Sequence, residues 1–407
     1  MLQGEGMHAV ILALHDLHRN SRVLKQANTL HEAGFDVTAV GIVRRSTDAE
    51  SERTPFGRIV RVRTTDRLHE EREASSSGAS VRQDPARSTL VAGLRTFLGR
   101  MRDNSLMARA AASLRPDVVI ASDLTAWASG YRVRQLTGSP LIADARDLVT
   151  DSRRTQHPVY LKMFRHVEGY VATRSDALTA VTPLMAQVLA ERYPAANVPI
   201  HVYNGPSTCV HPGSIEIHEP LRLLFQGNLL ANRHVDRMIE AAVALEGAAV
   251  LTIQGFGEQK RELEELADRL GAREVVRFVE PCAPHEVSEA AAQHDVGLVS
   301  NWDDTLNMQV TVGTKLFDYM SGGLAVVASA LPMYQMLLEE ADCGVVFDPR
   351  DPDALMLILR RLVNSPDEVL SMKRNAVAAC PRYSWDVQGA KFLEVVESVM
   401  SGGSRGA

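Results

Sequence analysis

The segment from Asn301 to Ser329 combines residue types that suit a phosphate and a ribose. Its sequence, NWDDTLNMQVTVGTKLFDYMSGGLAVVAS, places Lys315 and Asp318 three positions apart. A lysine in the first turn of a helix, beside amides without an intrahelical partner, suits a phosphate. A carboxylate one turn later can accept hydrogen bonds from both ribose hydroxyls. The pair predicts a nucleotide site, with a solvated surface ion pair as the alternative.

The flanking elements must hold this pair in place. The apolar runs 296–299 and 324–328 predict buried parallel strands with one helix between them. Three residues open that helix with a flexible backbone and a capping hydroxyl: Val312, Gly313 and Thr314. Three apolar side chains share one stripe and turn the helix toward the sheet: Leu316, Phe317 and Met320.

Both halves of the chain alternate strands with helices, which predicts an α/β protein with parallel sheets. The strand-like segments are 9–14, 35–43, 59–62, 118–121, 141–143 and 177–180, then 221–225, 249–253, 275–279, 296–299, 325–328 and 344–347. We expect two Rossmann-like domains, 1–204 and 205–385, joined by the polar stretch 204–219. Ligands of such folds collect at the carboxyl ends of the strands, so the natural site is the cleft between the domains.

Composition supports an ordinary globular protein. The chain has 407 residues, and 45% of them are hydrophobic, enough for two cores. A run of about 18 apolar residues is missing and the start does not read as a secretory signal, so we expect a cytoplasmic protein. The four cysteines are far apart, which predicts buried thiols rather than disulfides or a zinc site: Cys209, Cys282, Cys343 and Cys380.

Charge is distributed unevenly along the chain. Residues 1–200 hold 27 Lys and Arg against 21 Asp and Glu, a net charge of +6, so the remainder of the −6 chain carries −12. The basic half can steer an anionic acceptor or rest on anionic lipid, or it can simply be a solvated face. The cations concerned are Arg95, Arg100, Arg102, Arg153, Arg154, Lys162 and Arg165. The polar stretch 66–88 predicts a mobile loop, either idle or closing over an acceptor.

The string GTKLFDYMSGGLAVVAS resembles the "PNKLFEYMAAGLPVVAS" signature of a branch of glycosyltransferase family 4. The resemblance implies a GT-B fold with two Rossmann-like domains, and retaining transfer of a sugar from a nucleotide donor. It also implies that the final helix, 386–407, packs back on the first domain. Many relatives have a glutamate eight positions before the second acid. Val310 stands there, and Asn307 is a substitute donor contact.

Further stretches of the second half match the same family. In the FQGNL segment Gly227 lets the backbone approach the donor, Asn228 stands where many relatives have arginine, and Arg233 matches the residue that grips the diphosphate. Three more residues are expected at the donor through the resemblance: Gly255, Arg277 and Phe278.

The first half offers residues for the sugar and the acceptor. Ser122 and Asp123 match the family's "IHAHD" segment, with Ser122 in place of its last histidine, and the resemblance makes them catalytic together with Arg233 and Lys315. The acceptor side is expected to hold His15, Asp16, Asn20, Arg22 and Arg146, although the two histidines of the HDLHRNSRV segment can equally be surface residues.

These features favour a retaining glycosyltransferase acting on a natural product or a cell-surface glycan. The alternatives are a nucleotide-sugar epimerase and a non-catalytic partner of the same fold, the latter because of Val310 and Ser122. Asp303 and Asp304 lack the strand-end context of a metal site, so we expect no metal, no cofactor beyond the sugar donor as co-substrate, and no nucleic acid. The oligomeric state stays open.

Overall fold

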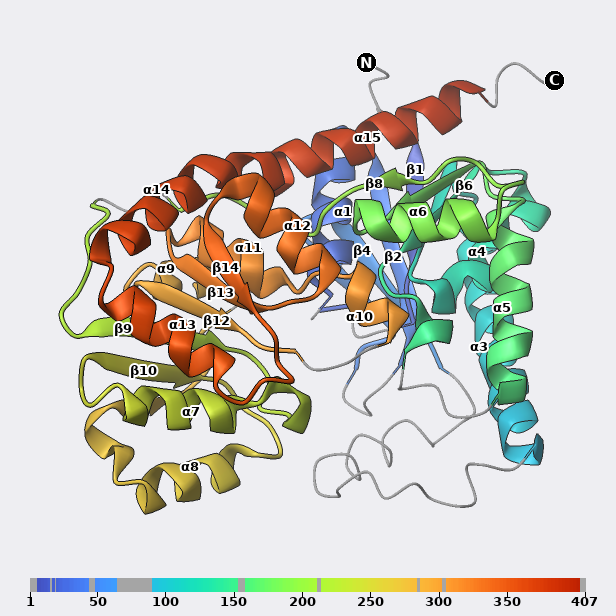
Figure 1. The fold of residues 1–407 in the computed structure, drawn as a ribbon. Coiled ribbons are helices and arrows are strands. Elements are labelled where there is room, and N and C mark those ends of the chain that lie inside the picture. Colours follow the sequence, from blue (N-terminus) through green and yellow to red (C-terminus); the bar gives the residue numbers. More distant parts are fainter. Residues whose placement is uncertain are drawn as a thin grey trace. The chain divides into compact units, whose positions relative to one another are not determined.

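The computed structural model describes residues 6–14, 17–18, 20–43, 48–63, 90–152, 158–210, 214–283, 286–301 and 305–402 (Figure 1). The chain forms two compact units. The first unit comprises residues 1–204, 305–311 and 388–407, and the second unit comprises residues 205–304 and 312–387. The predicted stretch 66–88 and the pair Asp303 and Asp304 lie outside the described residues.

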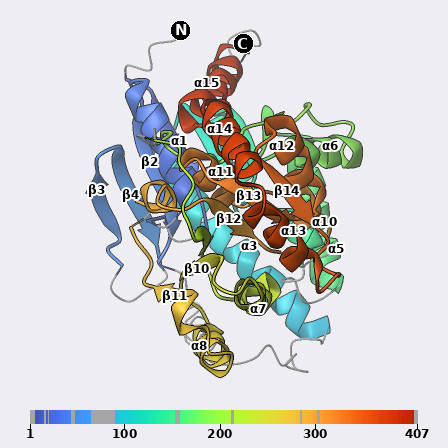
Figure 2. The same cartoon turned by 60° about the vertical axis from the view of Figure 1, so that its left-hand side comes forward.

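The first unit contains an eight-stranded sheet in the order β3-β4-β2-β1-β5-β6-β7-β8. Its strands are β1 (His8–Leu12), β2 (Asp36–Ile42), β3 (Ser51–Thr54), β4 (Gly57–Val62), β5 (Val118–Ser122), β6 (Leu141–Ala145), β7 (Ala177–Ala180) and β8 (Ile200–His201). All neighbours are parallel except β3, which pairs antiparallel with β4 at one edge (Figure 2). Strands β3 and β8 were not predicted from the sequence.

The helices of the first unit are α1 (Ser21–Glu32), α3 (Leu90–Ser113), α4 (Leu124–Thr137), the short η2 (Val149–Asp151), α5 (Pro158–Ala172), α6 (Pro183–Arg192) and α10 (Leu306–Val310). The last helix, α15 (Trp385–Gly402), belongs to this unit from Gln388 onward. Gln388 accepts a hydrogen bond from the backbone of Tyr203 at 3.0 Å, which attaches α15 to this unit.

The second unit contains six parallel strands in the order β11-β10-β9-β12-β13-β14. They are β9 (Leu221–Gln226), β10 (Ala249–Gln254), β11 (Val276–Val279), β12 (Val296–Val299), β13 (Ala325–Ser329) and β14 (Gly344–Phe347). The helices are η3 (Ala231–Arg233), α7 (Val235–Ala244), α8 (Lys260–Arg269), η4 (Ala272–Glu274), α9 (Val287–Ala291), α11 (Thr314–Ser321), α12 (Pro332–Ala341), α13 (Ala354–Val363) and α14 (Pro366–Tyr383). The strand order reverses between β9 and β12, where doubly wound sheets bind ligands.

The α/β prediction with two parallel-sheet domains is confirmed. One short segment differs from the predicted division, because α10 follows β12 in sequence but groups with the first unit. The side chain of Val310 is buried in the first unit's core, and the Thr182 hydroxyl donates a hydrogen bond to the carbonyl of Val310. Apolar burial therefore places α10 with the first sheet rather than with the strand that precedes it.

Candidate active site

Lys315 lies at the carboxyl end of β9, although α11 carries it from a distant part of the sequence. Gly227 follows β9 with φ of +133°, and a Cβ on that residue would lie 2.3 Å from Cε of Lys315 and 2.4 Å from Nζ. The ammonium also stands 5.0 Å from the centroid of the Phe225 ring, within cation–π range. The glycine thus leaves the space that the lysine side chain occupies.

Two cations share this place. Burial and the nearby charge of Arg233 together lower the pKa of Lys315 to about 7, with burial the larger cause and Asp318 partly opposing both. Arg233 ends η3, just before α7 and after the turn that follows β9. Like charges in a partly desolvated site repel, so this arrangement favours an anionic ligand that both residues can contact.

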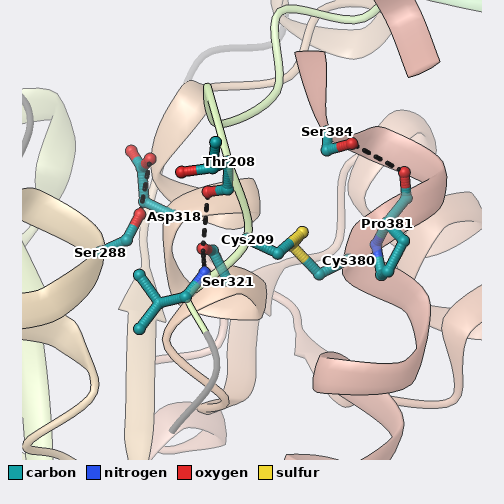
Figure 3. The surroundings of a disulfide bond; sticks show 9 residues. Thr208, Cys209, Ser288, Asp318, Ser321, Cys380, Pro381 and Ser384 are labelled. Atoms are coloured by element: carbon teal, nitrogen blue, oxygen red, sulfur yellow. Dashed lines mark hydrogen bonds between the residues drawn. A yellow bond between two sulfur atoms is a disulfide. The ribbon is translucent and has the colours of Figure 1, made fainter. Parts of the chain in front are cut away.

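Asp318 stands one helical turn beyond Lys315 and is half-buried. Ser288 lies in the first turn of α9, and its hydroxyl is 3.5 Å from Oδ1 of Asp318, at the limit of a hydrogen bond (Figure 3). Burial raises the pKa of the Cys282 thiol, and Asp318 adds to that rise, so the loop after β11 comes close to this carboxylate. This geometry is compatible with the expected contact to a ribose.

The glycines of the Gly255-Phe256-Gly257 turn serve mainly to pack it against the turn after β9. A Cβ on Gly255 would lie 2.0 Å from the carbonyl oxygen of Gly227, and the Leu229 amide donates to the Phe256 carbonyl at 2.8 Å. Asn228 is exposed in the turn after β9, Arg277 is exposed on the edge strand β11, and the neighbouring Phe278 is half-buried. The absence of a side chain at Gly255 thus allows its backbone to approach the turn after β9.

The start of α11 has an additional anchor. Gly313 has no side chain to cap the helix, and its amide donates to the Tyr334 hydroxyl at 3.3 Å. Val312 is half-buried, while Gly313 and Thr314 are exposed at the helix start. The amide of Gly313 at the start of α11 is thus directed at Tyr334 in this structure.

Ser122 and Asp123 lie at the carboxyl end of β5 in the first unit. The Ser122 side chain is fully buried, and its hydroxyl has no hydrogen-bond partner among the described residues. Asp123 adopts φ of +75°, a conformation that costs a non-glycine residue free energy and is concentrated at functional sites. Its amide donates to the carbonyl of Asp144 at 2.8 Å, so the strained turn is attached to β6.

Two of the residues expected on the acceptor side, Asn20 and Arg146, are in contact. Asn20 caps α1 by accepting from the amide of Val23, and the same Oδ1 accepts from Nη1 of Arg146 at 2.9 Å. Their contact joins the turn after β1 to the turn after β6. His15 and Asp16 lie outside the described residues.

The assignment of Arg22 to the acceptor side is wrong. Its side chain is completely buried and forms a bidentate pair with Asp144, at 2.8 Å from Nε and 2.7 Å from Nη2, while Nη1 donates to the carbonyl of Val202. Burial by itself raises the pKa of Asp144, but the charge and hydrogen bonds of Arg22 lower it overall. Arg22 therefore holds α1, β6 and the segment after β8 together and presents no surface to a ligand.

Asn307, expected as a donor contact, is occupied within the first unit. Its Oδ1 accepts from the amide of Leu148 at 2.7 Å, and its Nδ2 donates to Asp147 at 3.2 Å. Both ends of the amide are thus bound, which leaves Asn307 anchoring α10 in this structure. The neighbouring Val310 is 5% exposed and supplies no polar group.

The expectation of four free thiols is wrong. Cys209 and Cys380 form a disulfide that ties the segment after Asn204 to α14, while Cys282 and Cys343 are free (Figure 3). The same segment is held to α11, because the Val210 amide donates to the Ser321 hydroxyl at 3.0 Å. The two cysteines are 171 positions apart, a separation that gives no sign of pairing in sequence.

Sequence patterns also missed two buried tyrosines of the second unit whose hydroxyls accept from backbone amides. Tyr319 accepts from the amide of Gln226 at 2.8 Å, and Tyr334 accepts from Gly313 and from Asn301. A tyrosine within a helix carries no local sign of what its hydroxyl will contact, so no sequence pattern singled out these two residues. In the part of the chain that the structure describes, no three His, Cys, Asp or Glu side chains gather as a metal site, and no helix is long and apolar enough to cross a membrane.

Comparison with known proteins agrees with this architecture. Residues 20–205 match the "Glycosyl transferase 4-like domain" profile and residues 211–378 match "Glycosyl transferases group 1". D-inositol 3-phosphate glycosyltransferase 1 of Catenulispora acidiphila is 24% identical over 265 residues, covering 58% of this chain and 60% of that protein. The corresponding enzyme of Corynebacterium urealyticum is 28% identical over 142 residues, covering 35% of this chain and only 32% of its own length.

Solved structures share the fold over nearly the whole chain. Sucrose-phosphate synthase from Thermosynechococcus elongatus has a TM-score of 0.73 at 14% identity, covering 97% of this chain and all of that one. HepE of Anabaena, solved in complex with UDP, has a TM-score of 0.69 at 14% identity, covering 96% of this chain and all of that one. With two matching profiles in the expected order and two parallel-sheet units, the chain belongs to glycosyltransferase family 4 and has the GT-B fold.

Proposed function

We propose that this protein is a retaining glycosyltransferase that moves a sugar from a nucleoside-diphosphate sugar to a hydroxyl or amine of a natural product or a cell-surface glycan. The observation that carries the proposal is the placement of Arg233 and Lys315 together at the end of β9, beside Gly227. Two close cations suit the diphosphate of a leaving nucleotide, whose negative charge grows during transfer. The UDP complex of HepE supports this ligand class.

The diphosphate contacts can be tested directly. Arg233→Ala and Lys315→Ala should each weaken nucleoside-diphosphate binding by about 2–4 kcal/mol, because each removes a charged hydrogen bond from a partly desolvated phosphate. Calorimetry with UDP, GDP and ADP identifies the nucleotide that binds best and then measures each variant. Unchanged affinity in both variants would exclude this site.

The ribose contact is a separate claim. Asp318 is one turn from Lys315, so it can accept hydrogen bonds from the ribose while the lysine contacts phosphate. Asp318→Asn should bind the nucleotide more weakly, and the native protein should bind 2′,3′-dideoxyribose nucleotides more weakly than ribose nucleotides. Equal affinity for the two sugars would contradict the assignment.

In the proposed mechanism the bond between the anomeric carbon and the β-phosphate oxygen breaks, and a bond from that carbon to the acceptor oxygen or nitrogen forms on the same face. The acceptor proton passes to the leaving diphosphate. Arg233 and Lys315 stabilise the charge that develops there, and Ser122 and Asp123 contact the sugar or the acceptor. The two cations supply positive charge, so we propose that the reaction needs no metal and continues in EDTA. Nuclear magnetic resonance of the product decides the stereochemistry, since an α-linked donor giving a β-linked product would refute retention.

One observation favours a non-catalytic partner as the second candidate. Where many relatives have a glutamate, Val310 is buried in the first unit's core and offers no group to a donor sugar. A non-catalytic partner would bind the nucleotide sugar without consuming it. Slow donor hydrolysis or transfer to any acceptor, abolished in Lys315→Ala, would favour the enzyme.

We further propose a cytoplasmic protein that contacts the inner face of a membrane through α3. Three apolar side chains are exposed on one stripe of this helix, Val91, Leu94 and Leu98, together with Arg95 and Arg102. Apolar side chains interleaved with arginines suit the surface of an anionic bilayer. Of the other cations considered from the sequence, Arg165 is paired with Asp151 at 2.8 Å, and Arg153 and Arg154 lie outside the described residues.

Vesicle sedimentation tests this surface. The protein should bind vesicles that contain phosphatidylglycerol more strongly than pure phosphatidylcholine vesicles, and added salt should weaken the binding. Leu98→Ser with Arg95→Ser should abolish it, while Leu357→Ser, an exposed leucine on α13, serves as the matched control. Equal sedimentation of both variants would exclude this stripe as the contact.

A further inference from the structure

The side chain of Tyr334 is buried beneath the start of α11 at 1% exposure. Its hydroxyl oxygen accepts from Nδ2 of Asn301 at 2.8 Å and from the backbone amide of Gly313 at 3.3 Å. Asn301 follows β12, Gly313 precedes α11, and Tyr334 belongs to α12. One hydroxyl therefore connects three elements around the residues proposed to bind the donor.

Asn301 is itself held in place. Its amide donates to the hydroxyl of Ser329 at the end of β13, at 3.0 Å, and its side chain is 2% exposed. Its Oδ1 has no hydrogen-bond partner among the described residues, so in that part of the structure Tyr334 is what orients the side-chain amide. The ends of two adjacent strands thereby fix the tyrosine hydroxyl.

The first turn of α11 depends on this contact. Gly313 has no side chain with which to cap the helix, while its carbonyl accepts from the amide of Leu316 at 3.2 Å. An amide held at Gly313 therefore sets the direction in which the next two residues leave, and the second of them is Lys315. The Lys315 side chain packs directly over Gly227, in space that a Cβ on that residue would fill. A small shift of the first turn of α11 therefore changes where the ammonium lies.

Electrostatics indicate that this hydroxyl stays neutral beside the cationic site. Burial raises the pKa of Tyr334, while its hydrogen bond from Gly313, the charge of Arg233 and the bond from Asn301 act in the opposite direction with smaller effect. The influence of Arg233 also indicates that the hydroxyl is near the cations rather than in a remote part of the core. It can hold the backbone without neutralising Lys315 or Arg233.

We propose that Tyr334 is a positioning residue of the donor site, whose hydroxyl, oriented by Asn301, holds Gly313 and thereby sets the location of the Lys315 ammonium. This role rests on the proposed donor site and adds a residue that does not touch the substrate. It differs from simple packing, because only the hydroxyl and not the ring is required for it.

Tyr334→Phe removes the hydroxyl and keeps the ring. Tyr319→Phe is the matched control, since it also deletes a fully buried hydroxyl that accepts from a backbone amide, but at Gln226 instead of at the helix start. With UDP, GDP and ADP as probes, we expect Tyr334→Phe to bind the preferred nucleotide about three- to tenfold more weakly, the effect of losing the hydrogen bond that holds the Gly313 amide. The control should stay within about twofold of the native protein.

Proton uptake on nucleotide binding separates positioning from stability. The groups that act on Lys315 are Arg233 and Asp318, and at about pH 8 the native Lys315 should take up a proton when the diphosphate binds. A loosened first turn lets water reach Lys315, so Tyr334→Phe should take up fewer protons, as calorimetry in buffers of different ionisation enthalpy measures. A lower melting temperature alone would not change this number.

Three outcomes would overturn the proposal: native affinity and proton uptake in Tyr334→Phe, equal losses in Tyr319→Phe, or no binding of any probe by the native protein. The last outcome also removes the donor site, whereas the first two leave it standing. Should Tyr334→Phe fail to fold, Asn301→Ala keeps the hydroxyl but frees it to turn. That variant should weaken binding and reduce proton uptake in the same direction, and unchanged values would refute the role.

Discussion

The Lys315 side chain occupies the space that a side chain on Gly227 would need, with Nζ only 2.4 Å from where that Cβ would stand. Gly227→Ala should therefore displace the lysine and weaken nucleoside-diphosphate binding by about 1–3 kcal/mol, through strain and a weakened charged hydrogen bond. Gly247→Ala is the matched control, because Gly247 also has positive φ but nothing within 4 Å of its Cβ position. Equal affinities of the two variants in calorimetry would show that the close approach is unimportant.

Nucleotide affinity should fall as pH rises above about 7. The free protein releases the Lys315 proton around that pH, whereas a bound diphosphate favours the charged lysine, so binding takes up a proton and weakens up to about tenfold per pH unit above it. Lys315→Met should bind weakly and show no such dependence, as calorimetry across pH 6 to 9 would measure. An affinity of the native protein that stays constant over about this range would contradict the assignment.

The same pKa shift affects stability with a defined sign. Because the pKa of Lys315 is lower in the folded protein than in the unfolded chain, the unfolded chain binds more protons between about 7 and 10.5, and this residue's contribution to stability increases with pH across that window. Comparing urea midpoints of the native protein and Lys315→Met at about pH 7 and pH 9 isolates the contribution. The urea midpoint of the native protein should rise relative to that of the variant at the higher pH. A relative rise of the variant's midpoint would contradict the predicted sign.

Breaking the buried pair of Arg22 and Asp144 should destabilise the first unit without affecting the donor site. Arg22→Met leaves a buried carboxylate without its charge partner, which costs about 3–5 kcal/mol. Arg134→Met is the control, since Arg134 forms a similar bidentate pair with Asp176 at a half-exposed position. Such a pair contributes about 1 kcal/mol or less to the free energy of unfolding. Urea unfolding measures both, and a smaller loss for Arg22→Met than for Arg134→Met would contradict the structure.

Reduction of the disulfide between Cys209 and Cys380 should lower the melting temperature of the native protein. A crosslink that closes a loop with a sequence separation of 171 restricts the unfolded chain, an effect of about 2–5 kcal/mol. Cys209→Ser should melt at the temperature of the reduced native protein and respond little to reductant. Cys343→Ser, which removes a buried free thiol, should retain the response to reductant. Thermal unfolding with and without reductant checks both.

Local pattern was enough to predict the alternating strands and helices, the parallel sheets and the helix that bears Lys315 and Asp318. Apolar runs bounded by polar turns can be buried in few ways, of which a strand in a parallel sheet is one. The Gly-Thr-Lys sequence predicts a helix N-terminus from local residue types alone. The positions of Gly227 and Arg233 could also be predicted from the sequence, since both follow β9 closely and lie in a segment that resembles the family.

The contacts made by individual side chains required the tertiary structure. From the sequence, Arg22 was predicted to be a polar group beside a binding turn. In the structure its guanidinium is buried and binds Asp144 of β6 and the Val202 carbonyl after β8. Asn307 likewise turned toward the first unit, because the apolar face of α10 is buried there. A sequence specifies local backbone preference and which residues must be buried, whereas the partner that satisfies each buried polar group comes from distant strands and is decided only when the sheets assemble.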